Sequence, residues 1–291
     1  MNNVNAKIAD KGGLRWPAPA KLNLMLRIVG RKPDGYHLLQ TVFQFIDLCD
    51  YISFHLVDRP AICLKKSLPN LSDDQNLCLR AARLLQDESG YSHGVEIEIE
   101  KHLPMGAGLG GGSSDAATTL LALNELWGLH FSLGEIAKLG LKLGADVPVF
   151  VYGQAAWAEG VGEVLTPVEV PEPWYVVVKP DCHVSTSKIF TSPTLTRNND
   201  PVTLEKFISG WIANDCLQVV VETHPQVKLA IDDLSRFGLA RLTGTGACVF
   251  AAFKSELRAR QVVASLAGRW HAFVTKGLNL SPLRELLSTA L

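Results

Sequence analysis

The stretch Leu103-Pro104-Met105-Gly106-Ala107-Gly108-Leu109-Gly110-Gly111-Gly112-Ser113-Ser114-Asp115 contains five glycines, followed at once by two hydroxyls and a carboxylate. Ahead of it, residues 95–99 alternate apolar and acidic side chains with the period of a half-buried strand. Behind it, residues 116–127 (AATTLLALNELW) are good helix formers with apolar side chains three to four positions apart. The sequence therefore predicts a strand, a glycine loop and a helix N-terminus in that order.

This glycine loop has the composition of a phosphate-binding site, because backbone N–H groups can converge without Cβ obstruction beside a positive helix end. A Walker A motif is excluded, since Gly112 stands after Gly111 where lysine is required. The pattern GxGxxG is present at Gly106, Gly108 and Gly111, but residues 133–143 read as a helix where a dinucleotide fold needs a strand. A turn that only permits close packing would need one or two glycines. A nucleoside triphosphate site is favoured.

Composition narrows the class of protein. The 291 residues exceed one typical core, which favours two domains, and 47% hydrophobic with 20% charged residues is ordinary for a soluble enzyme. A net charge of −1 gives no reason to expect nucleic acid or a membrane as partner. Residues 1–14 are polar, without the apolar core of a signal peptide, and are expected to form a flexible leader.

The six cysteines are far apart and form no CxxC pair, and the eight histidines show no metal-ligand spacing. Reduced thiols and a cytoplasmic location are therefore expected, rather than a disulfide framework or a zinc site. No apolar run reaches the length that spans a membrane.

Other polar residues are ambiguous when each is read alone. Lys21 and Asn23 share one face of a predicted strand, where a lysine is most often a solvated edge charge. Tyr36 and His37 follow a Pro-Asp-Gly turn and are surface residues or a flat face for a planar ligand. Asp146 is either a turn-forming residue or a partly desolvated general base.

The remaining patterns predict the elements of the two halves. The linker Pro171-Glu172-Pro173 divides a first domain at 15–170 from a second at 171–291, and the order of elements in the second favours an α+β or ferredoxin-like fold. Strands are expected at 38–48, 51–57, 147–152, 174–179 and 272–274. Helices are expected at 73–86 (capped by Asp73 or Asp74), 214–221, 226–234 and 257–266, and a second glycine turn leads into a strand at 241–250.

Three motifs together resemble those of the GHMP small-molecule kinases. They are a proline-rich lead into Lys-Leu-Asn at 16–23, Pro-Met-Gly-Ala-Gly-Leu-Gly-Gly-Gly-Ser-Ser at 104–114 and Thr-Gly-Thr-Gly-Ala-Cys-Val-Phe at 243–250. Blocks at 18–24, 34–37, 144–150 and 158–162 resemble the branch that acts on a cytidine-diphosphate-linked polyol. Mevalonate and homoserine kinases share the glycine loop but not both the Gly-Tyr-His and Gly-Ala-Asp-Val-Pro blocks. The resemblance runs from about Trp16 to Pro282.

The resemblance implies a fold and a reaction. The fold is α+β, with a ribosomal-protein-S5-like N-terminal domain, a ferredoxin-like C-terminal domain and a deep cleft between them. The reaction is transfer of the γ-phosphoryl group of ATP to the 2-hydroxyl of 4-diphosphocytidyl-2-C-methyl-D-erythritol, in the non-mevalonate pathway to isoprenoids. Mg²⁺ should accompany ATP, because phosphate oxygens are hard ligands. Its protein ligands are not assigned by the sequence, and Ser113 or Ser114 is a candidate. A monomer or weak homodimer is expected.

The resemblance also assigns roles by position. Asp146 matches the base that accepts the hydroxyl proton, Lys21 the cation that orients and activates this hydroxyl, and Asn23 a substrate contact. The cytosine is expected among Tyr36, His37 and Phe190, with His37 reading its hydrogen-bonding edge. The ATP positions (adenine contacts first, then the glycine loop, then the second turn) are Asn76, Lys101, Pro104, Met105, Gly106, Ala107, Gly108, Leu109, Gly110, Gly111, Gly112, Ser113, Ser114, Gly244, Thr245 and Gly246.

Phosphoryl transfer requires in-line positioning and charge stabilisation more than covalent chemistry, and a lysine–aspartate pair beside a phosphate loop supplies part of both. Two alternatives stay open. One is another GHMP kinase that acts on a different alcohol, and the other is a non-catalytic nucleotide-binding homologue.

Overall fold

The computed structural model describes residues 14–69 and 71–290, so that residues 1–13 of the expected leader lie outside the described part. The strands are β1 (Trp16–Arg31), β2 (His37–Val57), β3 (Ile62–Leu64), β4 (Gly94–Glu100), β5 (Ala156–Glu159), β6 (Val164–Pro167), β7 (Trp174–Lys179), β8 (Arg241–Leu242), β9 (Val249–Phe253) and β10 (His271–Leu278). The helices are α2 (Leu77–Ser89), α3 (Gly111–Leu126), α4 (Leu133–Leu141), α5 (Val147–Tyr152), α6 (Thr186–Thr191), α7 (Leu204–Ile208), α8 (Leu217–Thr223), α9 (Pro225–Leu234), α10 (Glu256–Leu266) and α11 (Pro282–Ala290).

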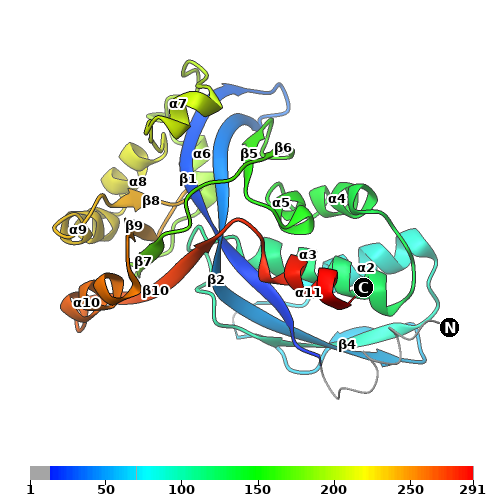
Figure 1. The fold of residues 1–291 in the computed structure, drawn as a ribbon. Helices are drawn as coiled ribbons and strands as arrows, with labels where there is room; N and C mark the ends of the chain where they lie inside the picture. The colour runs from blue at the N-terminus through cyan, green and yellow to red at the C-terminus, as the bar shows by residue number, and fades with distance from the viewer. Residues whose placement is uncertain (1–13, 70, 291) are drawn as a thin grey trace.

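Strand β2 is the centre of a ten-stranded sheet that runs through the described chain. The hydrogen-bonded path is β3-β4-β2-β10-β7-β9-β8, and β1 and β5 also pair with β2. At 21 residues, β2 is long enough to pair with β5 near its start and with β4 at its end. Because β10 pairs with both β2 and β7, the two halves of the chain share one sheet (Figure 1).

Strand β1 passes through three hydrophobic cores of the described residues. Trp16 and Ala18 pack in the core that α2 and α3 form with the sheet. Residues 20–25 contribute to a middle core, which they share with apolar residues of β7 and β9. Leu26 and Ile28 pack in a third core with α8, α9 and α10. One strand therefore connects both halves of the molecule.

Three shifts of register interrupt the pairing of β1 with β2, and two of them lie close to the site, between Pro19 and Ala20 and between Asn23 and Met25. Such irregularities bend a strand and increase its twist. The first two shifts flank Lys21 and Asn23, so the segment that carries the two candidate site residues has an irregularity on each side.

Helix α3 is buried over most of its length, including every residue from Ser114 to Asn124. Its sequence explains this, because no charged residue follows Asp115 until Glu125 and no polar face can form. Helices α2 and α5 and strand β1 surround it, and α11 returns the end of the described chain to this half, with Leu283 in the same core (Figure 1). The glycine loop therefore leads into a helix that is firmly packed in the core.

Residues 147–152 form helix α5, so the strand predicted there is wrong. Pro148 lies in the first turn of α5, where its missing N–H is not needed. The apolar, β-branched run suits a strand by local propensity, but its packing between α3 and α4 decides for a helix. Asp146 is consequently the residue at the N-terminus of a helix.

Two smaller corrections concern the first half. The strands predicted at 38–48 and 51–57 form the single strand β2. Helix α2 begins after Asn76, whose Oδ1 accepts hydrogen bonds from the N–H groups of Cys78 and Leu79, so neither Asp73 nor Asp74 is the cap. The α+β class is confirmed, and the other predicted helices and strands are present with shifted ends. The division at residues 170/171 stays a prediction.

Candidate active site

A cavity of about 1040 Å³ lies where the glycine loop, β1 and the segment around α6 meet. All but one of the predicted site residues line it; Ser114 is the exception and is fully buried in α3. The lining residues of the prediction are Lys21, Asn23, Tyr36, His37, Asn76, Lys101, Pro104, Met105, Gly106, Ala107, Gly108, Leu109, Gly110, Gly111, Gly112, Ser113, Asp146, Phe190, Gly244, Thr245 and Gly246.

The glycine loop enters α3 through a left-handed residue. Gly110 is the N-cap of α3 at φ 76°, and no side chain of the described residues caps this helix end. Gly108 and Gly106 are also left-handed, at φ 77° and 63°. Uncapped N–H groups at the start of a helix are free to bind an anion, and Gly110, Gly111 and Gly112 at this helix start line the cavity.

The glycine loop also packs directly against the second glycine turn. A Cβ on Gly108 would lie 2.5 Å from the carbonyl oxygen of Thr243 and 3.0 Å from that of Gly246. The N–H of Cys248 donates to the carbonyl of Ala107 at 3.1 Å. The two turns, more than 130 residues apart in sequence, therefore hold each other backbone to backbone.

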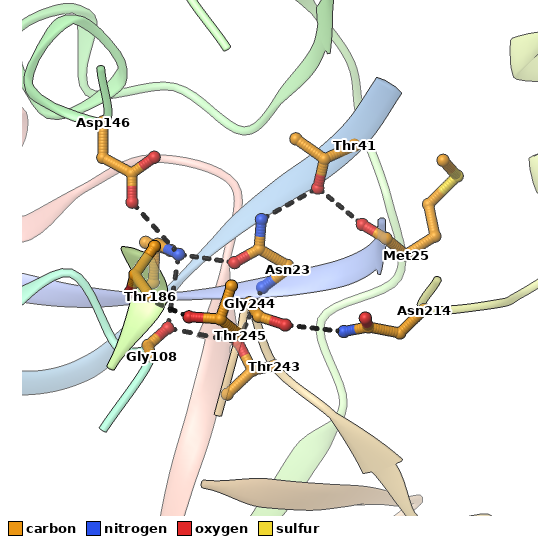
Figure 2. Close-up of polar contacts among 11 residues, drawn as sticks. Asn23, Met25, Thr41, Gly108, Asp146, Thr186, Asn214, Thr243, Gly244 and Thr245 are labelled. Atoms are coloured by element: carbon orange, nitrogen blue, oxygen red, sulfur yellow. Dashed lines mark hydrogen bonds and ion pairs between the residues drawn. The ribbon is translucent and has the colours of Figure 1, made fainter. Parts of the chain in front are cut away.

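The polar groups of the site meet at the ammonium of Lys21. Its side chain is only 4% exposed, and its Nζ lies 3.3 Å from Oδ2 of Asp146. It donates to Oδ1 of Asn23 and, at 3.2 Å, to the carbonyl of Gly108. One acceptor from the same strand and two from distant segments thus meet at one ammonium, and Figure 2 shows the dashed lines from Asn23, Gly108 and Asp146 converging. Residues whose sequence context was ambiguous are brought together with the glycine loop.

Asp146 contributes a carboxylate that is partly open to the cavity. It stands directly before α5 and its side chain is 36% exposed, without a capping hydrogen bond to that helix in the described chain. Two hydrogen bonds fix Asn23 in place. Its side-chain Nδ2 donates to Oγ1 of Thr41 at 2.9 Å, and its backbone N–H donates to Oγ1 of Thr243 at 3.0 Å (Figure 2). A reacting hydroxyl could therefore meet a carboxylate, an ammonium and an amide together.

The cavity also contains an aromatic pocket, which Tyr36, His37 and Phe190 line. His37 is 8% exposed, and its ring stacks on Phe190 with 4.8 Å between centroids and 24° between planes. Tyr36 is 62% exposed beside it. Arg197 donates from Nε to Nε2 of His37 at 3.1 Å. Burial lowers the pKa of His37, and the nearby charges of Arg197 and Arg31 lower it further.

The predicted adenine contacts have structural partners of their own. Lys101 forms ion pairs with Asp50 and with Asp115, the latter at 2.8 Å, and Asn76 caps α2. Burial raises the pKa of Asp115 to about 7, against the opposing effect of the Lys101 charge. Oδ1 of Asp115 has no hydrogen-bond partner among the described residues, although it is buried. Both Lys101 and Asn76 nevertheless line the cavity.

Sequence reasoning missed several residues that shape the site. Asn214 donates to the carbonyls of Gly244 at 2.8 Å and Leu242 at 3.1 Å, which fixes the second turn. Thr186 and Thr245, which both line the cavity, share a hydrogen bond of 2.9 Å (Figure 2). Neither Asn214 nor Thr186 has a local signal, because each contacts a partner that is at least 28 positions away.

Three further findings concern chemistry elsewhere. Across residues 14–69 and 71–290, no group of three or more His, Cys, Asp or Glu side chains could hold a metal ion. Within the same ranges, none of the helices is both long and apolar enough to cross a membrane. All six cysteines are described, and all are free thiols, as the sequence predicts.

Comparison with known proteins gives consistent matches. The family models for the GHMP kinases N terminal domain and the GHMP kinases C terminal domain match residues 76–154 and 195–272. A 4-diphosphocytidyl-2-C-methyl-D-erythritol kinase from Methylococcus capsulatus is 53% identical over 289 residues, covering 99% of each chain. One from Nitrosococcus oceani is 53% identical over 274 residues, covering 94% of this chain and 98% of the relative.

Solved structures of GHMP kinases match this chain as well. A crystal structure of 4-(cytidine 5'-diphospho)-2C-methyl-D-erythritol kinase matches with a TM-score of 0.78 and 33% identity, over 91% of this chain and 99% of that one. A mevalonate kinase matches with a TM-score of 0.68 at 21% identity, over 91% and 99%, and this match indicates the fold alone. The chain therefore belongs to the GHMP kinase family and, within it, to the branch formed by the 4-diphosphocytidyl-2-C-methyl-D-erythritol kinases.

Proposed function

We propose that this chain transfers the γ-phosphoryl group of ATP to the 2-hydroxyl of 4-diphosphocytidyl-2-C-methyl-D-erythritol, a step of the non-mevalonate pathway to isoprenoid precursors. The observation that carries the proposal is the meeting of Lys21 and Asp146, 3.3 Å apart, beside the glycine loop and in the same cavity as an aromatic pocket. A phosphate cradle, a proton acceptor and a flat-ring pocket are the parts that this reaction needs.

In this proposal the polyol hydroxyl lies between Asp146 and Lys21. The carboxylate of Asp146 accepts the hydroxyl proton, and the ammonium of Lys21 stabilises the negative charge that develops on the oxygen. Lys21 is suited to this role because Asn23 and Gly108 hold its Nζ in place. Asn23 orients the substrate, since its amide is fixed by Thr41.

The other predicted residues bind the two ends of the substrates. Residues 104–114 and 244–246 enclose the triphosphate, Asn76 and Lys101 lie near the adenine, and Tyr36, His37 and Phe190 surround the cytosine. This arrangement is supported by the single continuous cavity that joins these residues, except for Ser114. The monomer or weak homodimer and the cytoplasmic location stay predictions.

Mg²⁺ fits the donors of the site as a metal carried mainly by phosphate and water. The cavity offers the hydroxyl of Ser113 and the carboxylate of Asp146, and the described residues form no protein cage. Mg²⁺ is usually bound in this way, through few protein ligands and several waters. When bound, it neutralises phosphate charge. Ser113 is a better candidate ligand than Ser114, because Oγ of Ser114 is enclosed in α3 without access to the cavity.

The decisive experiment is a coupled assay of ADP release with and without the cytidyl substrate. We expect ADP formation only with the substrate, and its loss in Asp146→Asn. ADP formed equally without the substrate would rule out the kinase reaction, and no ADP under any condition would favour a non-catalytic homologue. CDP should inhibit by competition with the cytidyl substrate. Activity on mevalonate or homoserine that CDP leaves unchanged would instead identify another alcohol as the substrate.

A further inference from the structure

All three nitrogens of the Arg197 guanidinium donate hydrogen bonds at the edge of the aromatic pocket. Its terminal nitrogens donate to the carbonyls of Leu195 at 3.0 Å, Phe190 at 2.9 Å and Ser192 at 2.6 Å. Its Nε donates to Nε2 of His37 at 3.1 Å. Three backbone contacts therefore fix the direction of the fourth contact, and the guanidinium cannot turn away from His37 without breaking them.

This contact determines where His37 carries its proton. Arginine is always charged in proteins and offers only donors. A hydrogen bond from Arg197 therefore requires a lone pair on Nε2 of His37, and the proton of the neutral ring must lie on Nδ1. Burial, Arg197 and Arg31 all lower the pKa of His37, which agrees with a neutral ring. Nδ1–H is left as a donor, and it makes no hydrogen bond to any described residue.

The orientation of the two stacked rings indicates which part of a bound base would face this donor. The His37 ring lies within 24° of the Phe190 plane, so a base bonded edge-on to His37 also lies nearly parallel to Phe190. Cytosine offers an acceptor at N3, whereas uracil carries an N–H at that position. A fixed N–H donor on His37 thus meets a lone pair in one base and another donor in the other.

We propose that Arg197 is a positioning residue that holds His37 with its proton on Nδ1, and that the pocket thereby selects a cytosine-type base over a uracil-type base. The inference rests on the proposed function, in which a cytidyl group occupies this pocket. Arg197 itself does not touch the substrate in this proposal and acts through His37.

The first test compares kcat/KM for the cytidyl substrate with that for its uridyl analogue. We expect Arg197→Met to reduce the preference for cytidyl by roughly tenfold to a hundredfold, the range for a buried donor left without its partner. The loss should lie in KM for the cytidyl substrate, with KM for ATP near wild type. Arg31→Met is the matched control, because it removes a nearby charge that makes no hydrogen bond to His37, and the preference should persist.

The second test is a double-mutant cycle with His37→Asn. The amide nitrogen of asparagine can replace Nδ1 as a donor and needs no tautomer, so Arg197→Met should not change the base preference further in that background. A merely structural role for Arg197 would reduce the preference equally in both backgrounds and would overturn the inference. Nitrogen-15 NMR of the free enzyme gives a direct readout: Nδ1 should be the protonated nitrogen, and a protonated Nε2 in wild type would also overturn it.

The kinase reaction and the role of Arg197 can be disproved separately. If the wild-type enzyme forms no ADP with the cytidyl substrate, the proposed function fails. If it forms ADP but prefers cytidyl no more than uridyl, or if Arg197→Met keeps the wild-type preference, only the role of Arg197 fails. Melting temperatures of all variants, measured with circular dichroism, identify any variant whose pocket is lost through unfolding.

Discussion

The contact between the two glycine turns predicts that Gly108→Ala damages both stability and catalysis. At φ 77° an alanine costs about 1–2 kcal/mol of backbone strain. In addition, its Cβ would lie 2.5 Å from the carbonyl oxygen of Thr243, and this atom belongs to backbone that must move as a unit. Overpacking of this kind costs about 2 kcal/mol more.

Gly128→Ala separates these two costs. Gly128 has φ 65°, close to that of Gly108, but an added Cβ would meet no atom within 4 Å. The control therefore measures backbone strain without the clash. Since 1 kcal/mol shifts the melting temperature of a chain this large by roughly 2–4 °C, Gly108→Ala should melt about 5 °C below Gly128→Ala.

Kinetics complete the comparison. The carbonyl of Gly108 accepts a hydrogen bond from Lys21, so a displaced loop also displaces the ammonium. Errors of about 1 Å at a reacting group can cost roughly 10²-fold in rate. We expect Gly108→Ala to lower kcat and raise KM for ATP, and Gly128→Ala to leave both near wild type. Equal melting temperatures and equal kinetics in the two variants would refute the conclusion that contact between the turns sets the site.

Three other predictions follow from the site. Asp146→Asn should reduce kcat by roughly 10²- to 10⁴-fold with little change in melting temperature, as expected for loss of a general base, and near-normal turnover would reduce Asp146 to a residue of the helix start. Chelation of Mg²⁺ with EDTA should stop turnover and added Mg²⁺ should restore it, whereas undiminished turnover in EDTA would contradict a metal requirement. Because burial, Arg197 and Arg31 lower the pKa of His37, its ring is neutral near neutral pH. Protonation in acid adds a proton to Nε2, which removes the acceptor for Arg197 and disturbs the position of His37 in the pocket. KM for the cytidyl substrate should therefore be steady near neutral pH and rise only below the ordinary histidine value of 6.5, and a similar rise in His37→Asn would assign the effect to another group.

The glycine loop and its helix are readable from sequence because their signals are local. Five glycines, a preceding alternating strand and a following apolar helix all lie within residues 95–127. The pairing of Lys21 with Asp146 is different, since each residue alone has a common structural explanation. Only the resemblance of several motifs, taken together, pointed to their meeting, and the structure brings them to 3.3 Å.

Residues that act across long distances were not predictable. Arg197 contacts His37 across 160 positions, and nothing in its neighbourhood marks it. Asn214 is similar, because its role is to hold the carbonyls of a turn that begins 28 positions later. Helix α5 was mispredicted for a related reason: residues 147–152 have the local preference of a strand, and packing against α3 and α4 reverses it.

Strand β1 also has a consequence for how the enzyme can move. Lys21 and Asn23 lie in the part of β1 that belongs to the middle core, between the segments that pack with either half of the molecule. A rotation of the halves against each other would have its pivot near these two residues. The ammonium of Lys21 and the amide of Asn23 would then keep their places while the segments of β1 on either side of them moved.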